Sequence, residues 1–156
     1  MSQTLKEALI KIEKSLDGFA TKQQMGIYAR RGAHLIMQRT RLGKGVDKNN
    51  GPQKALKKLG LPYKKQRAKG KPPLSPLTSK SKSNLTRTGE LLSSIGGKGL
   101  GVRKALIYIK GKRNQDITEW QVDQGRRFLR FSRPEINNLA RQIGNDLEKY
   151  INKTLN

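Results

Sequence analysis

The sequence predicts an α+β fold in which helices pack on one side of an antiparallel β-hairpin. Three observations lead to this prediction. Apolar residues recur at helical spacing near both ends of the chain, in residues 5–40 and 136–151. Residues 102–110 and 116–122 are rich in β-branched and aromatic side chains, which is typical of strands. The five residues between them, 111–115, are turn formers, so these two strands are expected to pair as a hairpin. All 156 residues are expected to form a single domain.

The N-terminal part, residues 1–43, is expected to form one bent helix or two helices. Thr4-x-x-Glu7 and Thr21-x-x-Gln24 both have the spacing of a capping box. Gly18 is expected to interrupt the first helix, whose apolar stripe runs from Leu5 to Phe19, and a second, narrower stripe of small residues follows Thr21. The second stripe consists of Met25, Ala29, Ala33, Ile36 and Thr40.

Two glycines inside the second stripe, Gly26 and Gly32, need a separate explanation. Each costs about 1 kcal/mol relative to alanine inside a helix. Either a neighbouring segment approaches the helix closely at these positions, or the helix simply tolerates them. Both interpretations stay open at this point.

The middle of the chain, residues 44–84, is expected to be a basic, extended tract. Residues 48–89 contain twelve Lys or Arg, no Asp or Glu, and five of the six prolines. Proline removes backbone donors and like charges repel, so regular structure should be sparse, with at most a helical turn over residues 53–59. We expect residues 44–82 to be mobile in the isolated subunit and to become ordered in an assembly.

Eight basic residues of this tract are the candidate contacts to a polyanion or an acidic partner. The other interpretation is a solvated loop without a special role. The eight residues are Lys54, Lys57, Lys58, Lys64, Lys65, Arg67, Lys69 and Lys71.

Residues 85–95 are expected to form a short helix with a marked start. Thr88 is the candidate cap, and Glu90 lies in the first turn, where the helix dipole favours an anion. Leu91, Leu92 and Ile95 share one apolar face. The glycine-rich residues 96–101 that follow are expected to be a flexible turn.

The last part, residues 85–156, ends in the clearest helical pattern of the chain. Ser132-x-x-Glu135 has capping-box spacing, and Pro134 stands near the first helical position. We expect the apolar stripe of this helix to lie on the hairpin. The stripe consists of Ile136, Leu139, Ala140, Ile143, Leu147, Tyr150 and Ile151.

The charge balance indicates a polyanionic partner. The chain has 34 Lys and Arg against 11 Asp and Glu, a formal net charge of +23. Nucleic acid, an acidic protein surface and an anionic membrane all fit such a charge. No apolar run approaches the ~20 residues that cross a bilayer, and the N-terminus lacks the apolar region of a signal peptide. We therefore expect a protein that is located in a cytoplasm and not in a membrane.

The sequence predicts no enzyme, no cofactor and no metal. Cysteine is absent, the acids are dispersed, and no nucleotide-binding or catalytic motif occurs. His34 is the only histidine, and a surface or packing role is favoured for it. Motifs of sequence-specific nucleic-acid binding are missing too, so the basic residues favour contacts to phosphate without sequence readout.

Three segments resemble the bacteriophage virion-morphogenesis family, the phage Mu-like proteins that complete the tail or neck at the head–tail junction. Lys82-Ser-Asn-Leu-Thr-Arg-Thr-Gly-Glu-Leu-Leu-Ser-Ser-Ile95 is similar to the family's "TG.L..SI" signature. Pro73–Thr78 is similar to the approach to that signature, and Arg127–Ser132 to the entry into the last helix. The three segments occur in this order between residues 73 and 132.

The resemblance implies a non-enzymatic virion protein that is assembled in the host cytoplasm. Its copies would form a homo-oligomeric ring, commonly a hexamer, that contacts neighbouring neck or connector proteins and the tail tube, with DNA passing through the axis. The matching residues would form the structural framework: Thr88, Gly89, Leu91, Ile95, Phe128 and Leu129. The alternative hypothesis is a sequence-independent nucleic-acid-binding protein that uses the basic tract, residues 44–82.

Overall fold

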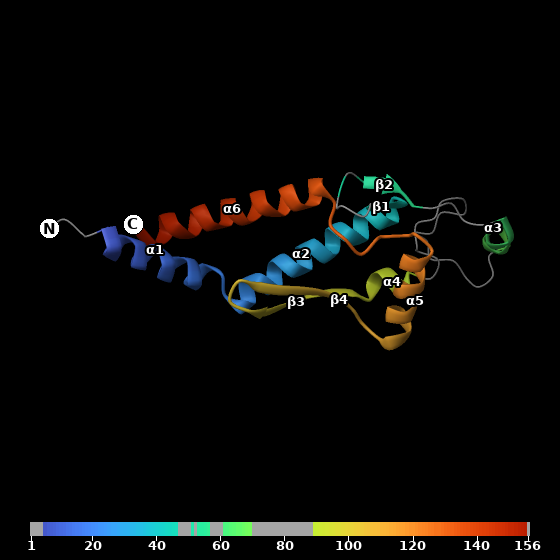
Figure 1. The fold of residues 1–156 in the computed structure, drawn as a ribbon, viewed down its shortest axis with the longest axis horizontal. Helices are drawn as coiled ribbons and strands as arrows, with labels where there is room; N and C mark the ends of the chain where they lie inside the picture. The colour runs from blue at the N-terminus through green and yellow to red at the C-terminus, as the bar shows by residue number, and fades with distance from the viewer. Residues whose placement is uncertain (1–4, 47–50, 52, 57–60, 70–88, 156) are drawn as a thin grey trace.

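The computed structural model describes residues 5–46, 51, 53–56, 61–69 and 89–155, and its architecture is α+β, as predicted. Figure 1 shows an elongated molecule with a central helix, α2 (Lys22–Arg41), between two other layers. On one side of α2 lies α6 (Arg133–Leu155), and on the other lies a hairpin of β3 (Ile95–Gly101) and β4 (Lys104–Ile109). The remaining elements are α1 (Leu5–Phe19), β1 (Lys44–Val46), β2 (Gln53–Ala55), α3 (Leu61–Ala68), α4 (Glu90–Ser93) and α5 (Lys112–Asp123).

The N-terminal part forms two helices, α1 and α2, and α2 begins at a side-chain N-cap. Thr21 is the N-cap of α2, and its Oγ1 accepts a hydrogen bond from the backbone N–H of Gln24 at 3.2 Å. Gly18 lies within α1 and is therefore not the break. The predicted stripe of α2 is largely confirmed, because Ala29, Ala33, Ile36 and Thr40 are buried. Thr4, of the first predicted capping box, lies outside the described residues.

The prediction of a flexible turn over residues 96–101 is wrong, because these glycines belong to strand β3. They are needed because the backbone of α2 lies directly on this strand. A Cβ on Gly97 would lie 2.3 Å from the carbonyl carbon of Ala29, and a Cβ on Gly99 would lie 1.9 Å from the carbonyl oxygen of Lys22. A Cβ on Gly26 would lie 3.2 Å from the backbone nitrogen of Gly99. Of the two interpretations of Gly26, close approach by a neighbouring segment is therefore the one that holds.

The second strand predicted over residues 116–122 is also wrong, because this segment is part of helix α5. The helix begins after Gly111, whose φ of 80° turns the chain out of β4. Lys112 and Asp116 form an ion pair of 2.9 Å at the i,i+4 spacing of a helix. Thr118 and Gln121, three residues apart, are the buried positions. The β-propensity of the segment is overridden by this helical packing.

The hairpin therefore consists of β3 and β4, and α2 covers it where α6 was predicted to do so. Ile95 pairs with Ile109 in an antiparallel register that runs to Gly101 opposite Lys104, with an irregularity near Gly99. The small residues of α2 allow the close approach that the glycine strand requires. The bulkier apolar residues of α6 do not, and α6 packs on α1 and α2.

The middle tract contains more regular structure than predicted. Strand β1 pairs antiparallel with β2, so the helical turn predicted over residues 53–59 is wrong at residues 53–55. Leu56 is buried, and its N–H donates to the carbonyl of Gly43 at 2.8 Å. The N–H of Val46 donates to the carbonyl of Arg127 at 2.9 Å. These contacts tie the start of the tract to the rest of the molecule, and helix α3 is a further element that the sequence did not predict.

Two separate groups of buried apolar residues lie along α2. The smaller one consists of Phe19, Ala20 and Tyr28, with Ile143, Leu147 and Tyr150 of α6 packed against it. The larger one joins α2, the short helix α4, both strands of the hairpin and the segment before α6. Its members are Ala33, Ile36, Leu56, Leu91, Leu92, Ile95, Ile109 and Phe128. Leu91, Leu92 and Ile95 are all buried, as predicted, but they do not share one helix face, because α4 ends at Ser93 and Ile95 begins β3.

Candidate functional site

The segment that leads into α6 is held in place by a buried arginine of α2. Arg39 is only 3% exposed. Its Nη1 donates to the carbonyl of Arg130 at 2.8 Å, and its Nη2 donates to the carbonyl of Phe128. Nη1 also forms an ion pair with Glu135. Burial lowers the pKa of Arg39. The neighbouring carboxylate of Glu135 raises this pKa, but by less than burial lowers it.

Glu135 has a second role as the predicted capping residue of α6. Its Oε2 accepts hydrogen bonds from both the backbone N–H and the Oγ of Ser132, each at 2.7 Å. The N–H of Ile136 donates to the carbonyl of Ser132 and continues the first turn. One carboxylate therefore joins the start of α6 to the middle of α2. The sequence predicted the cap from Ser132 and Glu135, but the part played by Arg39 was missed.

The residues singled out by the family resemblance lie in two regions of the chain that meet in the larger core. Leu91 and Ile95 come from α4 and β3, and Phe128 comes from the segment before α6. Phe128 is completely buried, and Leu129 packs against the same cluster.

The start of α4 differs from the predicted cap. Gly89 is the N-cap, with φ 76°, and no side chain forms a capping hydrogen bond there. Thr88, the predicted cap, lies outside the described residues. Gly89 is suited to this position because a side chain is disfavoured at positive φ.

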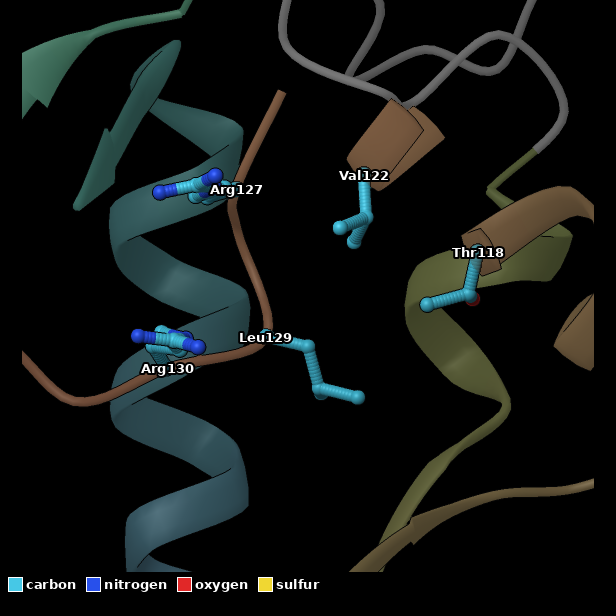
Figure 2. Close-up of a pocket in the computed structure, with 5 residues that line it drawn as sticks. All are labelled: Thr118, Val122, Arg127, Leu129 and Arg130. Atoms are coloured by element: carbon cyan, nitrogen blue, oxygen red, sulfur yellow. The ribbon is translucent and has the colours of Figure 1, made fainter. Parts of the chain in front are cut away.

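A pocket of about 530 Å³ lies between α5 and the segment before α6. Figure 2 shows the side chains of Thr118, Val122 and Leu129 pointing into it. The side chains of Arg127 and Arg130 lie on the other side of their segment, in front of α2. None of these five lining residues has a carboxylate, an imidazole or a thiol. The pocket therefore combines the apolar side chains of Val122 and Leu129 and the hydroxyl of Thr118 with a wall formed by the segment of Arg127 and Arg130, and α5 continues beside it with Trp120, which is 54% exposed.

The predicted basic contacts are divided among separate elements. Lys54 is exposed on β2, Lys64 and Lys65 lie on α3, and Lys69 is exposed just after α3. Arg67 also belongs to α3. Lys57, Lys58 and Lys71 lie outside the described residues. Lys54 is thus on a hairpin that packs on the core, while four of the other basic residues belong to α3 or directly follow it.

The described ranges contain neither a metal-binding cluster nor a helix suited to cross a membrane. No group of three or more His, Asp or Glu residues that could hold a metal ion occurs there. Among the described helices, none combines the length and the apolar character that crossing a bilayer requires.

Comparisons of the chain with protein-family models, with curated proteins and with solved structures found no match.

Proposed function

We propose that this chain is a non-enzymatic phage structural protein that forms a ring at the head–tail junction and completes the tail or neck around the DNA channel. The observation that carries the proposal is the convergence of Leu91, Ile95 and Phe128 in one core. These residues come from two of the three segments that resemble the virion-morphogenesis family. Motif residues that pack on one another form a structural unit, which supports a framework role for them.

The exposed apolar residues support assembly into a ring. Leu100 and Val102, near the turn of the β3–β4 hairpin, are 52% and 51% exposed. Trp120 and Val122 of α5 are 54% and 38% exposed. Figure 1 shows the hairpin turn and α5 at opposite ends of the hairpin. Two different patches at opposite ends allow a head-to-tail contact between copies, and such heterologous contacts form a ring when the rotation between copies closes.

The charge of the chain fits a position around DNA. A net charge of +23 destabilises close packing of identical subunits through mutual repulsion. A polyanion in the axis of the ring would offset this repulsion. Neighbouring neck, connector and tail tube proteins would be the other partners.

The ring can be tested with the purified full chain by light scattering coupled to size-exclusion chromatography and by negative-stain microscopy. Trp120→Asp and Leu100→Asp should each yield monomers. Every proposed contact joins the hairpin end of one copy to α5 of the next, and each variant disrupts one of these two patches in all copies. Their mixture should yield dimers and nothing larger, because one intact hairpin end and one intact α5 remain between the two variants. Lys153→Asp, on the exposed end of α6 and away from both patches, is a control for the added negative charge and should leave the ring intact.

Two results would contradict the proposal. One is a wild-type chain that stays monomeric at all concentrations in the presence and absence of DNA. The other is absence of the protein from purified particles, together with normal joining of heads and tails when its gene is deleted. A monomer that coats DNA and is missing from particles would favour the alternative, a sequence-independent nucleic-acid-binding protein.

A further inference from the structure

A second hollow, of about 420 Å³, lies between α2 and α6. Its lining residues are Arg30, Arg31, His34, Leu35 and Gln142. Four of these five side chains carry nitrogen donors, and Leu35 provides the apolar part of the wall. The twenty residues of α2 include no Asp or Glu. We refer to this hollow as the α2–α6 groove.

The two arginines of the groove differ in their partners. Arg31 donates from Nη1 to Oδ2 of Asp146 at 3.0 Å, and its guanidinium lies 5.5 Å from the centre of the Tyr28 ring. Its guanidinium is therefore held by the Asp146 carboxylate and the Tyr28 ring, while 45% of its side chain remains exposed to solvent. Arg30 is exposed, and no carboxylate of the described chain lies within ion-pair distance of it. The groove thus contains the guanidinium of Arg31 in an ion pair with Asp146, and the guanidinium of Arg30, which has no carboxylate of the described chain within ion-pair distance.

The two polar residues beside the arginines are oriented by neighbours on their own helices. Nε2 of His34 lies 2.8 Å from Nε2 of Gln38. Which of these two nitrogens donates depends on the tautomer of His34. Gln142 donates from Nε2 to Oδ1 of Asn138 at 2.7 Å. Both side chains therefore have defined orientations before any ligand enters.

We infer that the α2–α6 groove binds a phosphate group of a nucleic-acid backbone, with Arg30 as the principal contact. A guanidinium presents a planar pair of N–H donors that matches two phosphate oxygens. Arg31, fixed by Asp146, supports the site as a second cationic group. The groove would bind phosphate whether or not the chain belongs to a phage neck, and it lies on different elements from the basic tract of residues 44–82.

The surroundings of the groove favour nucleic acid over an acidic protein. A protein interface usually has apolar and aromatic residues at its centre, and the groove offers only Leu35, which is half-buried. The larger exposed apolar side chains, such as Trp120 and Leu100, belong to α5 and to the hairpin. A partner that brings negative charge and little apolar surface is the backbone of DNA or RNA. Such binding should not depend on base sequence.

The test uses the full chain and a fluorescein-labelled 20-base-pair duplex DNA of mixed sequence, with anisotropy measured between 50 and 200 mM NaCl. If Arg30 neutralises one phosphate, Arg30→Gln should weaken binding about eightfold at 0.1 M salt and reduce the log–log salt slope by about 0.9. A second DNA of different sequence should give the same result. Arg113→Gln on α5 removes the same charge elsewhere and should change affinity less than twofold. Circular dichroism at 222 nm verifies that both variants are folded.

Two competition experiments distinguish a nucleic-acid phosphate from free phosphate and from an acidic protein. Inorganic phosphate at millimolar concentration should displace the DNA no better than sulfate of equal ionic strength. Displacement by phosphate alone would mean a site for a free phosphate and would overturn the assignment to nucleic acid. Polyglutamate that binds as tightly as DNA, with the same dependence on Arg30, would overturn it in favour of an acidic protein. Equal effects of Arg30→Gln and Arg113→Gln would show that only the overall charge matters. A wild-type chain that forms rings but does not bind DNA would overturn the groove assignment and leave the proposed ring unaffected.

Discussion

Replacing Gly97 or Gly99 by alanine should destabilise the protein far more than the same change at Gly101. In β3, a Cβ on Gly97 would lie 2.3 Å from the carbonyl carbon of Ala29, and one on Gly99 would lie 1.9 Å from the carbonyl oxygen of Lys22. Normal contacts of this kind are longer than 3 Å, so α2 and the hairpin would have to separate. At Gly101 no atom lies within 4 Å of the added carbon.

The expected magnitude follows from the atoms that have to move. Overpacking of a dense interior costs about 1–3 kcal/mol. The obstructing atoms here belong to the backbone of a long helix and not to a flexible side chain, so we expect the upper end, about 3 kcal/mol. For a chain of this length, such a loss corresponds to a decrease of Tm of about 6–12 °C.

Urea unfolding followed by circular dichroism at 222 nm measures this effect directly. Gly101→Ala is the control within the same strand and should unfold near the wild-type midpoint. Gly144→Ala, at an open position of α6, is the control for alanine in a helix and should stabilise the protein by about 1 kcal/mol. If Gly97→Ala, Gly99→Ala and Gly101→Ala share one midpoint, the direct contact between α2 and β3 does not exist.

Four further substitutions test the rest of the fold. Arg39→Ala should cost about 3–5 kcal/mol in urea unfolding, because it leaves the buried carboxylate of Glu135 without its ion-pair partner; a loss below 1 kcal/mol would contradict this. Ile143→Ala and Leu147→Ala should each cost about 1–2 kcal/mol, below the usual range for a core position because both residues are only partly buried; unchanged unfolding would show that α6 does not pack there. The hydrogen bond from Arg31 lowers the pKa of Asp146 below its ordinary value of 3.8, so its contribution is present at neutral pH and lost as the pH falls below that value. The difference in Tm between wild type and Asp146→Asn should therefore shrink between pH 7 and pH 3, and a constant difference would refute the ion pair.

The parts of the fold that were predicted correctly are marked by sequence patterns within a single helix. Thr21 and the pair Ser132 and Glu135 cap helices through hydrogen bonds to residues within one turn, so their spacing alone identifies them. The small-residue stripe of α2 likewise shows its buried face through its period. The same signals mark α6, but they do not say which neighbour its apolar face meets.

The parts that the sequence did not predict depend on contacts between distant segments. Glycine has no side chain, so β3 has no pattern of apolar and polar residues, and its strand conformation follows from the backbone of α2 that lies on it. In α5, Trp120 and Val122 resemble strand residues by type, but the buried positions Thr118 and Gln121 follow a helical period.

The candidate site was predicted only in part, because it too depends on contacts between distant segments. Leu91, Ile95 and Phe128 were found through motif resemblance, and their contact in one core could not be derived from their spacing. Arg39 was missed because a charged residue near the end of a basic helix is usually exposed. Its only signal in the sequence is its place next to the buried stripe, between Ile36 and Thr40. The pocket beside α5 was missed because that segment was predicted to be a strand.

The division of the apolar interior into two clusters along α2 implies that the molecule opens in two steps. Amides of α1 and of the C-terminal half of α6 depend on the small cluster around Phe19 and Tyr28. They should exchange with solvent through a local opening of low free energy. Amides of β3, β4 and the second half of α2 depend on the larger cluster and should exchange only when the whole chain unfolds. α2 itself, whose Lys22 and Ala29 lie on β3, stays with the larger unit, so α1 and the end of α6 can open while the rest of the subunit stays folded.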